Sequence, residues 1–142
     1  MQYDFLDRNL AEALHAALTE DAFYIAMETS VSDATHDRRE AMFRYFDYSM
    51  REAHLDGHLD VHEDSAAAIW NLPLSGDRAR DVKRSKTDFL RAHMGEPSVD
   101  TYERVGAFMS NQSSPIISED AWYLSILGVA PGKQGEGLGG RL

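Results

Sequence analysis

The sequence of 142 residues contains no cysteine and no long apolar run. Without cysteine the chain can form neither disulfides nor thiolate metal sites, and a reducing cytoplasm is the expected compartment. No stretch approaches the roughly 20 apolar residues of a membrane span, and the first residues lack the basic and apolar regions of a signal peptide. We therefore expect a cytoplasmic protein with no membrane partner.

Basic residues are also scarce. Fourteen Lys and Arg stand against 24 Asp and Glu, which gives a formal net charge of −10. Non-specific binding of nucleic acid relies on clustered Lys and Arg, so we expect no nucleic-acid partner. An acidic surface attracts cations such as amines over long range, although the same charge also serves simply to keep a protein in solution. The length and an apolar fraction of 43% predict a single domain over residues 1–142.

Apolar periodicity predicts four helices before the C-terminal segment. Leucines repeat every fourth residue over 7–19, where Asp7 or Asn9 is a suitable N-cap. A second helix is expected over 36–54, capped by Asp33 or Thr35, with a stripe that faces the core. Two more are expected over 78–94 and 98–111, separated by Gly95 and Pro97 as stops and with Ser98 as cap. The residues expected to face the core are Met42, Phe43, Phe46, Met50, Ala53, Val82, Phe89, Leu90, Met94, Val105, Phe108 and Met109.

Alternating polar and apolar residues predict a β-hairpin between these helices, with strands over 58–63 and 65–70. Residues 2–6 are a candidate edge strand, and Phe23 and Tyr24 are expected either in the core or in a turn beside an acceptor pocket. Three histidines invite a metal interpretation, but a helix end and a strand do not bring them together, so we expect no metal. These histidines are His54, His58 and His62.

The C-terminal segment has the most informative order of residues. Residues 122–129 are all apolar, aromatic or small, which predicts a strand buried on both faces, and Pro131 should end that strand. Four glycines and the start of a helix follow. A strand, a glycine-rich loop and a helix N-terminus can together bind phosphate, because the amide hydrogens there are unpaired and the helix dipole favours an anion. The glycines are Gly135, Gly137, Gly139 and Gly140.

Spacing distinguishes two phosphate-binding interpretations of this loop, and a plain glycine-rich turn is the third alternative. The pattern G-x-G-x-x-G over residues 135–140 matches the dinucleotide fingerprint. That fingerprint directly follows its strand and precedes an acidic residue by about 20 positions. Here residues 130–134 intervene, and no such acidic residue follows, so the fingerprint is the weaker interpretation.

The pattern Q-x-x-G-x-G over residues 134–139, preceded by L-x-V-x-P over 127–131, resembles the acyl-CoA-binding motif of the GCN5-related N-acetyltransferases. The resemblance implies an α+β (α/β) fold with a mixed, mostly antiparallel central sheet flanked by helices, and acetyl-CoA as co-substrate. Backbone groups of the strand would pair with the pantetheine arm, and amides of the loop would bind the pyrophosphate. The residues implied in coenzyme A binding are Leu127, Gly128, Val129, Gln134, Gly135, Glu136, Gly137, Leu138, Gly139 and Gly140.

The same resemblance implies transfer of an acetyl group to a primary amine of a small molecule or peptide, by direct attack on the thioester. A base must deprotonate the amine, and a donor must stabilise the oxyanion. No residue stands out as catalytic; polar groups that could relay a proton are Glu28, Glu63, Asp120, Tyr123 and Ser125. A non-catalytic acyl-CoA-binding or protein-interaction module is the alternative.

The resemblance covers roughly the first two-thirds of the family's domain, and the family's later strands have no counterpart before Leu142. We therefore expect a fragment of a longer protein. If the natural chain is this short, the apolar edge of the strand over 122–129 predicts a homo-oligomer.

Overall fold

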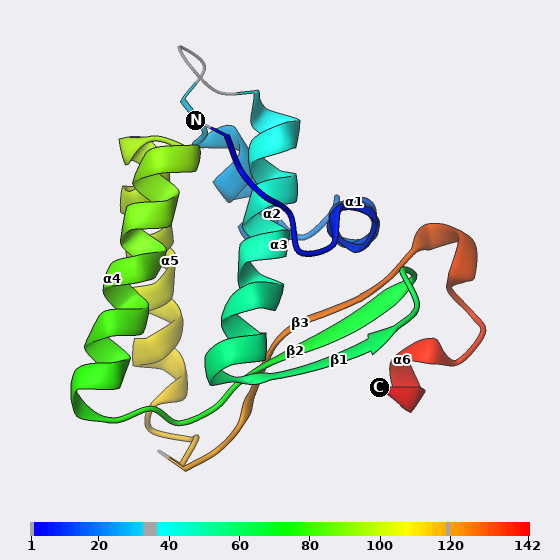
Figure 1. The fold of residues 1–142 in the computed structure, drawn as a ribbon. Coiled ribbons are helices and arrows are strands. Elements are labelled where there is room, and N and C mark those ends of the chain that lie inside the picture. The colour runs from blue at the N-terminus through cyan, green and yellow to red at the C-terminus, as the bar shows by residue number, and fades with distance from the viewer. Residues whose placement is uncertain (1, 33–36, 119) are drawn as a thin grey trace. The chain divides into compact units, whose positions relative to one another are not determined.

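The computed structural model describes residues 2–32, 37–118 and 120–142. In that part of the chain it contains six α-helices and a three-stranded antiparallel sheet, which confirms the predicted α+β class (Figure 1). None of these helices is both long and apolar enough to cross a bilayer. In chain order the elements are α1 (Arg8–Ala17), α2 (Ala22–Thr29), α3 (Arg38–Asp56), β1 (His58–His62), β2 (Ala66–Asn71), α4 (Gly76–His93), α5 (Glu96–Ser113), β3 (Tyr123–Val129), the 3-10 helix η1 (Pro131–Lys133) and α6 (Leu138–Arg141).

The described residues form two compact units. The sheet unit comprises Gln2–Glu20, Phe43–Leu72 and Trp122–Leu142, and the helical unit comprises Asp21–Met42 and Pro73–Ala121. The prediction of a single domain over residues 1–142 stays a prediction.

Aspartates begin three of the helices. The carboxylates of Asp7, Asp21 and Asp37 accept hydrogen bonds from backbone N–H groups in the first turns of α1, α2 and α3. Such caps satisfy donors that a helix leaves unpaired at its N-terminus. Asp7 was one of two predicted caps for α1, whereas the predicted caps Asp33 and Thr35 lie outside the described residues.

The strands of the sheet unit run in the order β1–β2–β3, and both pairs are antiparallel. The predicted hairpin is confirmed to within one residue at the ends of β1 and β2. Along β2 and β3 the register is regular from Ala66↔Val129 to Ile69↔Ile126, and the next pair is Trp70↔Leu124. Ser125 is therefore an extra residue on β3, which makes a β-bulge.

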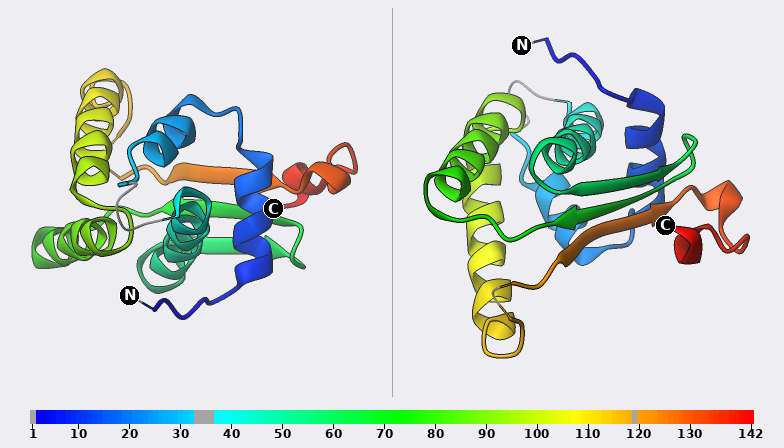
Figure 2. Two further views of the ribbon diagram at one scale, coloured as in Figure 1. Left: turned by 90° about the horizontal axis from the view of Figure 1, so that it is seen from above. Right: turned by 60° about the horizontal axis from the view of Figure 1, so that its bottom comes forward.

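Helices lie on both faces of this sheet (Figures 1 and 2). A Cβ built on Gly128 would stand 2.6 Å from Cδ2 of Leu14, so α1 packs against β3 at a position where only glycine leaves room. Side chains of successive strand residues alternate between faces, and the next residue, Val129, approaches Gly139 of α6 on the opposite face. The buried apolar side chains of the sheet unit are Leu10, Ala11, Leu14, Phe43, Tyr45, Phe46, Met50, Ala53, Ala66, Ala67, Ala68, Ile69, Ile126 and Leu138.

The prediction that the strand over 122–129 is buried on both faces is wrong. Trp122 is 55% exposed, and Tyr123, Leu124 and Leu127 are between 37% and 43% exposed. Within the described residues β3 is an edge strand, and α6 reaches its second face only near Val129. The apolar run was correctly assigned to a strand, and Pro131 ends it as expected, because η1 begins there.

The predicted strand over residues 2–6 is also wrong, since this segment joins no ladder. Polar groups of this N-terminal segment donate instead to the carboxylate of Asp47 on α3, which is fully buried. Asp47 accepts from the Tyr3 hydroxyl at 2.7 Å and from the backbone N–H groups of Leu6 at 3.0 Å and Asp7 at 2.8 Å. Burial of the Tyr3 hydroxyl, and then its hydrogen bond to Asp47, raise the pKa of Tyr3 above its ordinary value.

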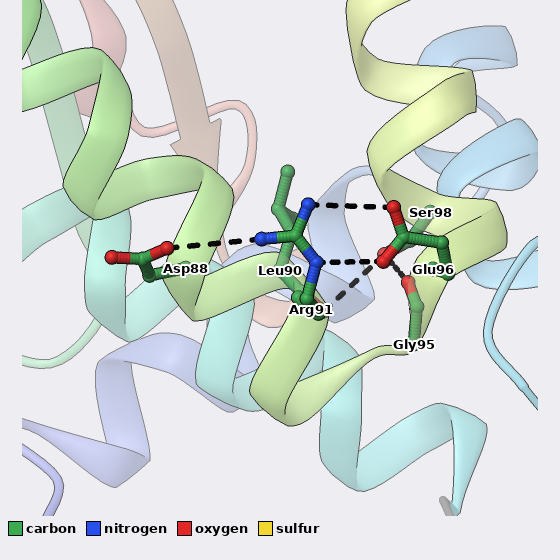
Figure 3. A network of polar contacts seen from close by, with 6 residues as sticks. All are labelled: Asp88, Leu90, Arg91, Gly95, Glu96 and Ser98. Carbon is green, nitrogen blue, oxygen red and sulfur yellow. Dashed lines mark hydrogen bonds and ion pairs between the residues drawn. The ribbon is translucent and has the colours of Figure 1, made fainter.

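In the helical unit, α4 and α5 are joined by a tight turn at Gly95, whose φ of 95° favours glycine (Figure 3). Arg91 donates from Nε to Glu96 at 2.6 Å, and this pair raises the pKa of Arg91 and lowers that of Glu96. Ser98 donates to the Gly95 carbonyl at 2.6 Å. Gly95, not Ser98, is the N-cap, and Pro97 lies in the first turn of α5, where proline is tolerated because the N–H there has no helical partner.

Two other predictions in the helical unit are corrected. Of the two alternatives for Phe23 and Tyr24, the turn is wrong, because both lie on the helix α2, where they are half-buried, and Phe23 packs on Tyr102 with ring centroids 6.3 Å apart. Phe108 and Met109 were predicted to face the core, but they are 64% and 44% exposed. The predicted core positions of α3 and α4 are confirmed apart from Val82, which is half-buried.

We expect Asp47→Ala to lower the free energy of unfolding by about 3 kcal/mol, because it leaves several donors of the N-terminal segment without their acceptor. Tyr3→Phe removes one hydrogen bond and should cost about 1 kcal/mol. Glu12→Ala, which breaks the exposed Arg8–Glu12 pair, is the control and should cost less than about 0.5 kcal/mol. Urea unfolding measures all three, and equal losses for Asp47→Ala and Glu12→Ala would contradict the anchoring role.

Candidate glycine-loop site

One backbone hydrogen bond shows which way the backbone N–H and C=O groups point along β3. Ala130 donates its N–H to the Ser65 carbonyl at 2.7 Å, just beyond the β2–β3 ladder. In an antiparallel ladder, pairs that exchange hydrogen bonds alternate with pairs that do not. Since Ser65 and Ala130 are a hydrogen-bonded pair, Ala67 and Gly128 are the next such pair, and this alternation is the phase of the ladder. The backbone groups of Gly128 therefore point toward β2, whereas those of Leu127 and Val129 point toward the open edge of the sheet.

The side chain of Gln134 occupies part of this edge. Its Nε2 donates to the Val129 carbonyl oxygen at 3.0 Å, which agrees with an outward direction for that oxygen. The bond ties the loop after β3 back to the strand it leaves. Gln134, the first residue of the predicted motif, is thus a positioning residue in this geometry.

The loop that follows is exposed from Pro131 to Gly137. Gly135 and Gly137 have φ of 86° and 78°, a region that residues with a Cβ rarely adopt, so the loop needs glycine at both positions. In the part of the chain that the structure describes, the backbone N–H groups of Gln134 to Gly137 donate to no protein acceptor. These amides are available to an anion that approaches from solvent.

Two other predicted site residues anchor the loop. Leu138 is 6% exposed and is the first residue of α6, which packs on β2 and β3. Gly139 follows it against Val129, while the side chain of Glu136 is exposed. Lys133 and Arg141 flank the glycines and are exposed, so each places a cation next to the loop.

The structure places the predicted residues over 127–129 and 134–140 close together, but their contacts differ. Leu127 and Val129 present backbone groups at the open edge, whereas Gly128 pairs with Ala67 and makes room for α1. Contact of all these residues with coenzyme A stays a prediction.

The predicted proton-relay residues are divided between the two units. Tyr123 and Ser125 lie on β3, with Ser125 at the bulge, and Glu63 lies in the β1–β2 turn with φ of 51°. Glu28 and Asp120 belong to the helical unit. Within the described residues, the side chains of Tyr123 and Ser125 hydrogen-bond to no other protein group, so no base is paired with either hydroxyl.

Sequence reasoning missed a polar and aromatic group on the sheet. His58 Nε2 lies 3.0 Å from Asp60 Oδ1, and the rings of Trp70 and His58 both contact that of Trp122. The predicted hairpin could have indicated part of this group, because a tight hairpin places the start of its first strand, at His58, opposite the end of its second strand, at Trp70. Among the described residues, no three potential metal ligands of the His, Cys, Asp and Glu types come together, His58 included.

A scan of the chain against models of known protein families found no match, and a search of curated proteins found no similar sequence. The resemblance to the acetyltransferases therefore rests on the sequence motif alone.

We expect Gly128→Ala to lower the free energy of unfolding by about 1–3 kcal/mol, because its methyl group would overlap with Leu14. A Cβ at Gly132 meets nothing within 4 Å, so Gly132→Ala is the control and should change stability by less than about 0.5 kcal/mol. Combining Gly128→Ala with Leu14→Ala should cost less than the sum of the single changes. Additive losses in urea unfolding would show that α1 does not contact β3 at this position.

Proposed function

We propose that this chain binds acetyl-CoA at the glycine loop and transfers its acetyl group to a primary amine. The observation that supports this most strongly is the placement of two kinds of free backbone group at one end of β3. The N–H and carbonyl of Leu127 and the N–H of Val129 face the open edge directly before a loop with unpaired amides between Gln134 and Gly137, while the Val129 carbonyl accepts from the Gln134 side chain. An extended arm could pair with the edge while its diphosphate accepts from the loop.

The charge of the loop is compatible with a polyanionic ligand despite the net charge of −10. Lys133 and Arg141 are exposed on either side of the glycines, and Glu136 is the one carboxylate within the segment 131–142. Backbone amides supply the rest of the positive potential. These features favour a phosphate-containing ligand over a neutral one.

The bulge at Ser125 offers a location for the chemistry. The bulge leaves Ser125 without a partner residue on β2, between the pairs Ile69↔Ile126 and Trp70↔Leu124. A free N–H at this point would stabilise the oxyanion that forms when the amine attacks the thioester carbonyl. The nitrogen–carbon bond forms and the nitrogen loses a proton to solvent, while the carbon–sulfur bond breaks and the thiolate takes up a proton from solvent.

A non-catalytic acyl-CoA-binding module is the second candidate. It is favoured by the isolation of the Tyr123 and Ser125 hydroxyls from any base in the described part of the chain. Both candidates bind the cofactor, and only the first turns it over. The cysteine-free composition suits a cytoplasmic location for either.

Calorimetry with acetyl-CoA tests binding. Gly137→Ala should weaken acetyl-CoA binding at least tenfold, because alanine at a φ of 78° forces the loop to rearrange. Gly132→Ala is the matched control, and its affinity should equal that of the unchanged chain. Thiol release from acetyl-CoA across a panel of primary amines then separates the enzyme from the binding module. If Gly137→Ala binds acetyl-CoA with unchanged affinity, the glycine loop is not part of the binding site.

We also propose that, when no acetyl-CoA is bound, the open edge of β3 pairs with a second copy of the chain. Residues 121–130 contain no charged side chain, and edge strands of this kind pair with other strands when nothing covers them. Leu127→Lys should shift the 142-residue chain toward a monomer in light scattering at micromolar concentration. Val61→Lys, on β1 at the other edge, is the control, and an equal shift in both variants would exclude β3 as the interface.

A further inference from the structure

The sheet unit contains an exposed cluster that the glycine-loop proposal does not use. We call it the tryptophan cluster, and it consists of His58 and Asp60 on β1, Trp70 on β2, and Trp122 just before β3. Trp122 lies beside both other rings, with its centroid 5.8 Å from that of His58 and 6.4 Å from that of Trp70. Asp60 lies beside the same imidazole, with its Oδ1 3.0 Å from Nε2 of His58.

The register places this cluster on the face of the sheet opposite α1. Ala67 pairs with Gly128, which faces α1, and Trp70 lies three residues further along β2, so its side chain is on the other face. His58 is the cross-strand partner of Trp70 and shares that face. The helix α6 packs near Val129, toward the opposite end of the strands, so it leaves the cluster accessible.

The exposure of the cluster is large for tryptophan. Trp122 is 55% exposed, and the side chains of His58 and Asp60 are 48% and 39% exposed. Placing an indole in water costs hydrophobic free energy, which a ligand that covers the ring would recover. An exposed indole that contacts the His58 ring, with the Asp60 carboxylate on that same ring, therefore offers a surface for a ligand with apolar and cationic parts.

No basic side chain of the strands competes for these rings. β1, β2 and β3 contain neither Lys nor Arg, and no Lys or Arg of the described residues lies over Trp70 or Trp122. The face of an indole attracts cations, most strongly alkylated ammonium groups that carry little hydration. The net charge of −10 raises the local concentration of such cations.

We propose that the tryptophan cluster binds an organic ammonium cation, which lies over the Trp122 ring with the Asp60 carboxylate as its counter-ion. The site does not require the glycine loop. A second step rests on the proposed function: Trp122 stands three residues before the bulge at Ser125, about 10 Å along an extended strand, so a bound amine lies at the same end of β3 as the proposed place of acyl transfer. The cluster is then the surface that selects a cationic acceptor.

The chain offers a direct reporter, because Trp70 and Trp122 are its only tryptophans. Choline is the probe, and its neutral isostere 3,3-dimethylbutan-1-ol is the matched control ligand. Choline should change the fluorescence and the two indole N–H resonances saturably, with a midpoint on the order of millimolar concentration, as expected for one exposed ring and one carboxylate. The neutral isostere and sodium chloride at equal ionic strength should give no saturable change.

Three variants identify the groups. Trp122→Leu should abolish the response of the Trp70 indole, and Asp60→Asn should weaken choline binding at least fivefold. Asp64→Asn removes the same charge from the exposed β1–β2 turn and should leave binding unchanged. Circular dichroism checks that each variant is folded, and Trp122→Phe, which keeps a ring, should retain weakened binding.

A response that does not saturate, or one that choline and its isostere share, would overturn the proposal and leave the cluster with a packing role. Equal weakening by Asp60→Asn and Asp64→Asn would overturn the counter-ion role. The experiment contains no acetyl-CoA, so its failure leaves the glycine-loop proposal intact. Conversely, Gly137→Ala should bind choline normally even if it binds no acetyl-CoA.

Discussion

The hydrogen bond from the Ala130 N–H to the Ser65 carbonyl fixes the phase of the β2–β3 ladder, and the rest of the candidate site depends on that phase. With this phase, the backbone groups of Gly128 point toward β2, and the face on which a side chain would stand is packed against α1. The backbone groups of Leu127 and Val129 point toward the open edge. A shift by one residue would reverse every one of these assignments. It would also place Leu127 or Val129 against α1, where a Cβ at the Gly128 position already approaches Leu14 to 2.6 Å. The close packing of α1 and the open edge of β3 are thus two consequences of one register.

The glycine loop extends this arrangement beyond the strand. Gln134 ties the loop to the outward carbonyl of Val129, Gly135 and Gly137 supply positive φ, and Leu138 anchors the start of α6. The unpaired amides therefore lie in a segment that is attached at both ends. Attachment lowers the entropy that a ligand must remove from the loop on binding. This pre-organisation is the physical basis of the acyl-CoA proposal, whereas the tryptophan cluster lies at the other end of the strands and depends on the registers that bring β1, β2 and the start of β3 together.

Local patterns in the sequence predicted most elements, because apolar periodicity, caps and proline act over a few residues. The stripes of α1, α3 and α4, the hairpin, and the end of β3 at Pro131 follow from such patterns. Long-range contacts did not follow. The role of Asp47 depends on donors 40 or more positions away, and the exposure of Trp122 and Leu127 depends on which elements cover β3. For the site, the sequence indicated the loop and its glycines. It could not show that the backbone of Gly128 faces β2 while those of Leu127 and Val129 face the open edge, because the ladder phase is a property of two strands together.

Amide resonances of the folded chain during titration with acetyl-CoA test the central claim most directly, because they report on each backbone N–H separately. If the ladder phase and the loop geometry govern binding, the largest shifts will occur at Gln134 to Gly140 and at Leu127 and Val129, while the Gly128 N–H, already paired with β2, will shift little. Shifts that are as large at Gly128 as at its two neighbours, or that leave the loop amides unchanged, would contradict the account.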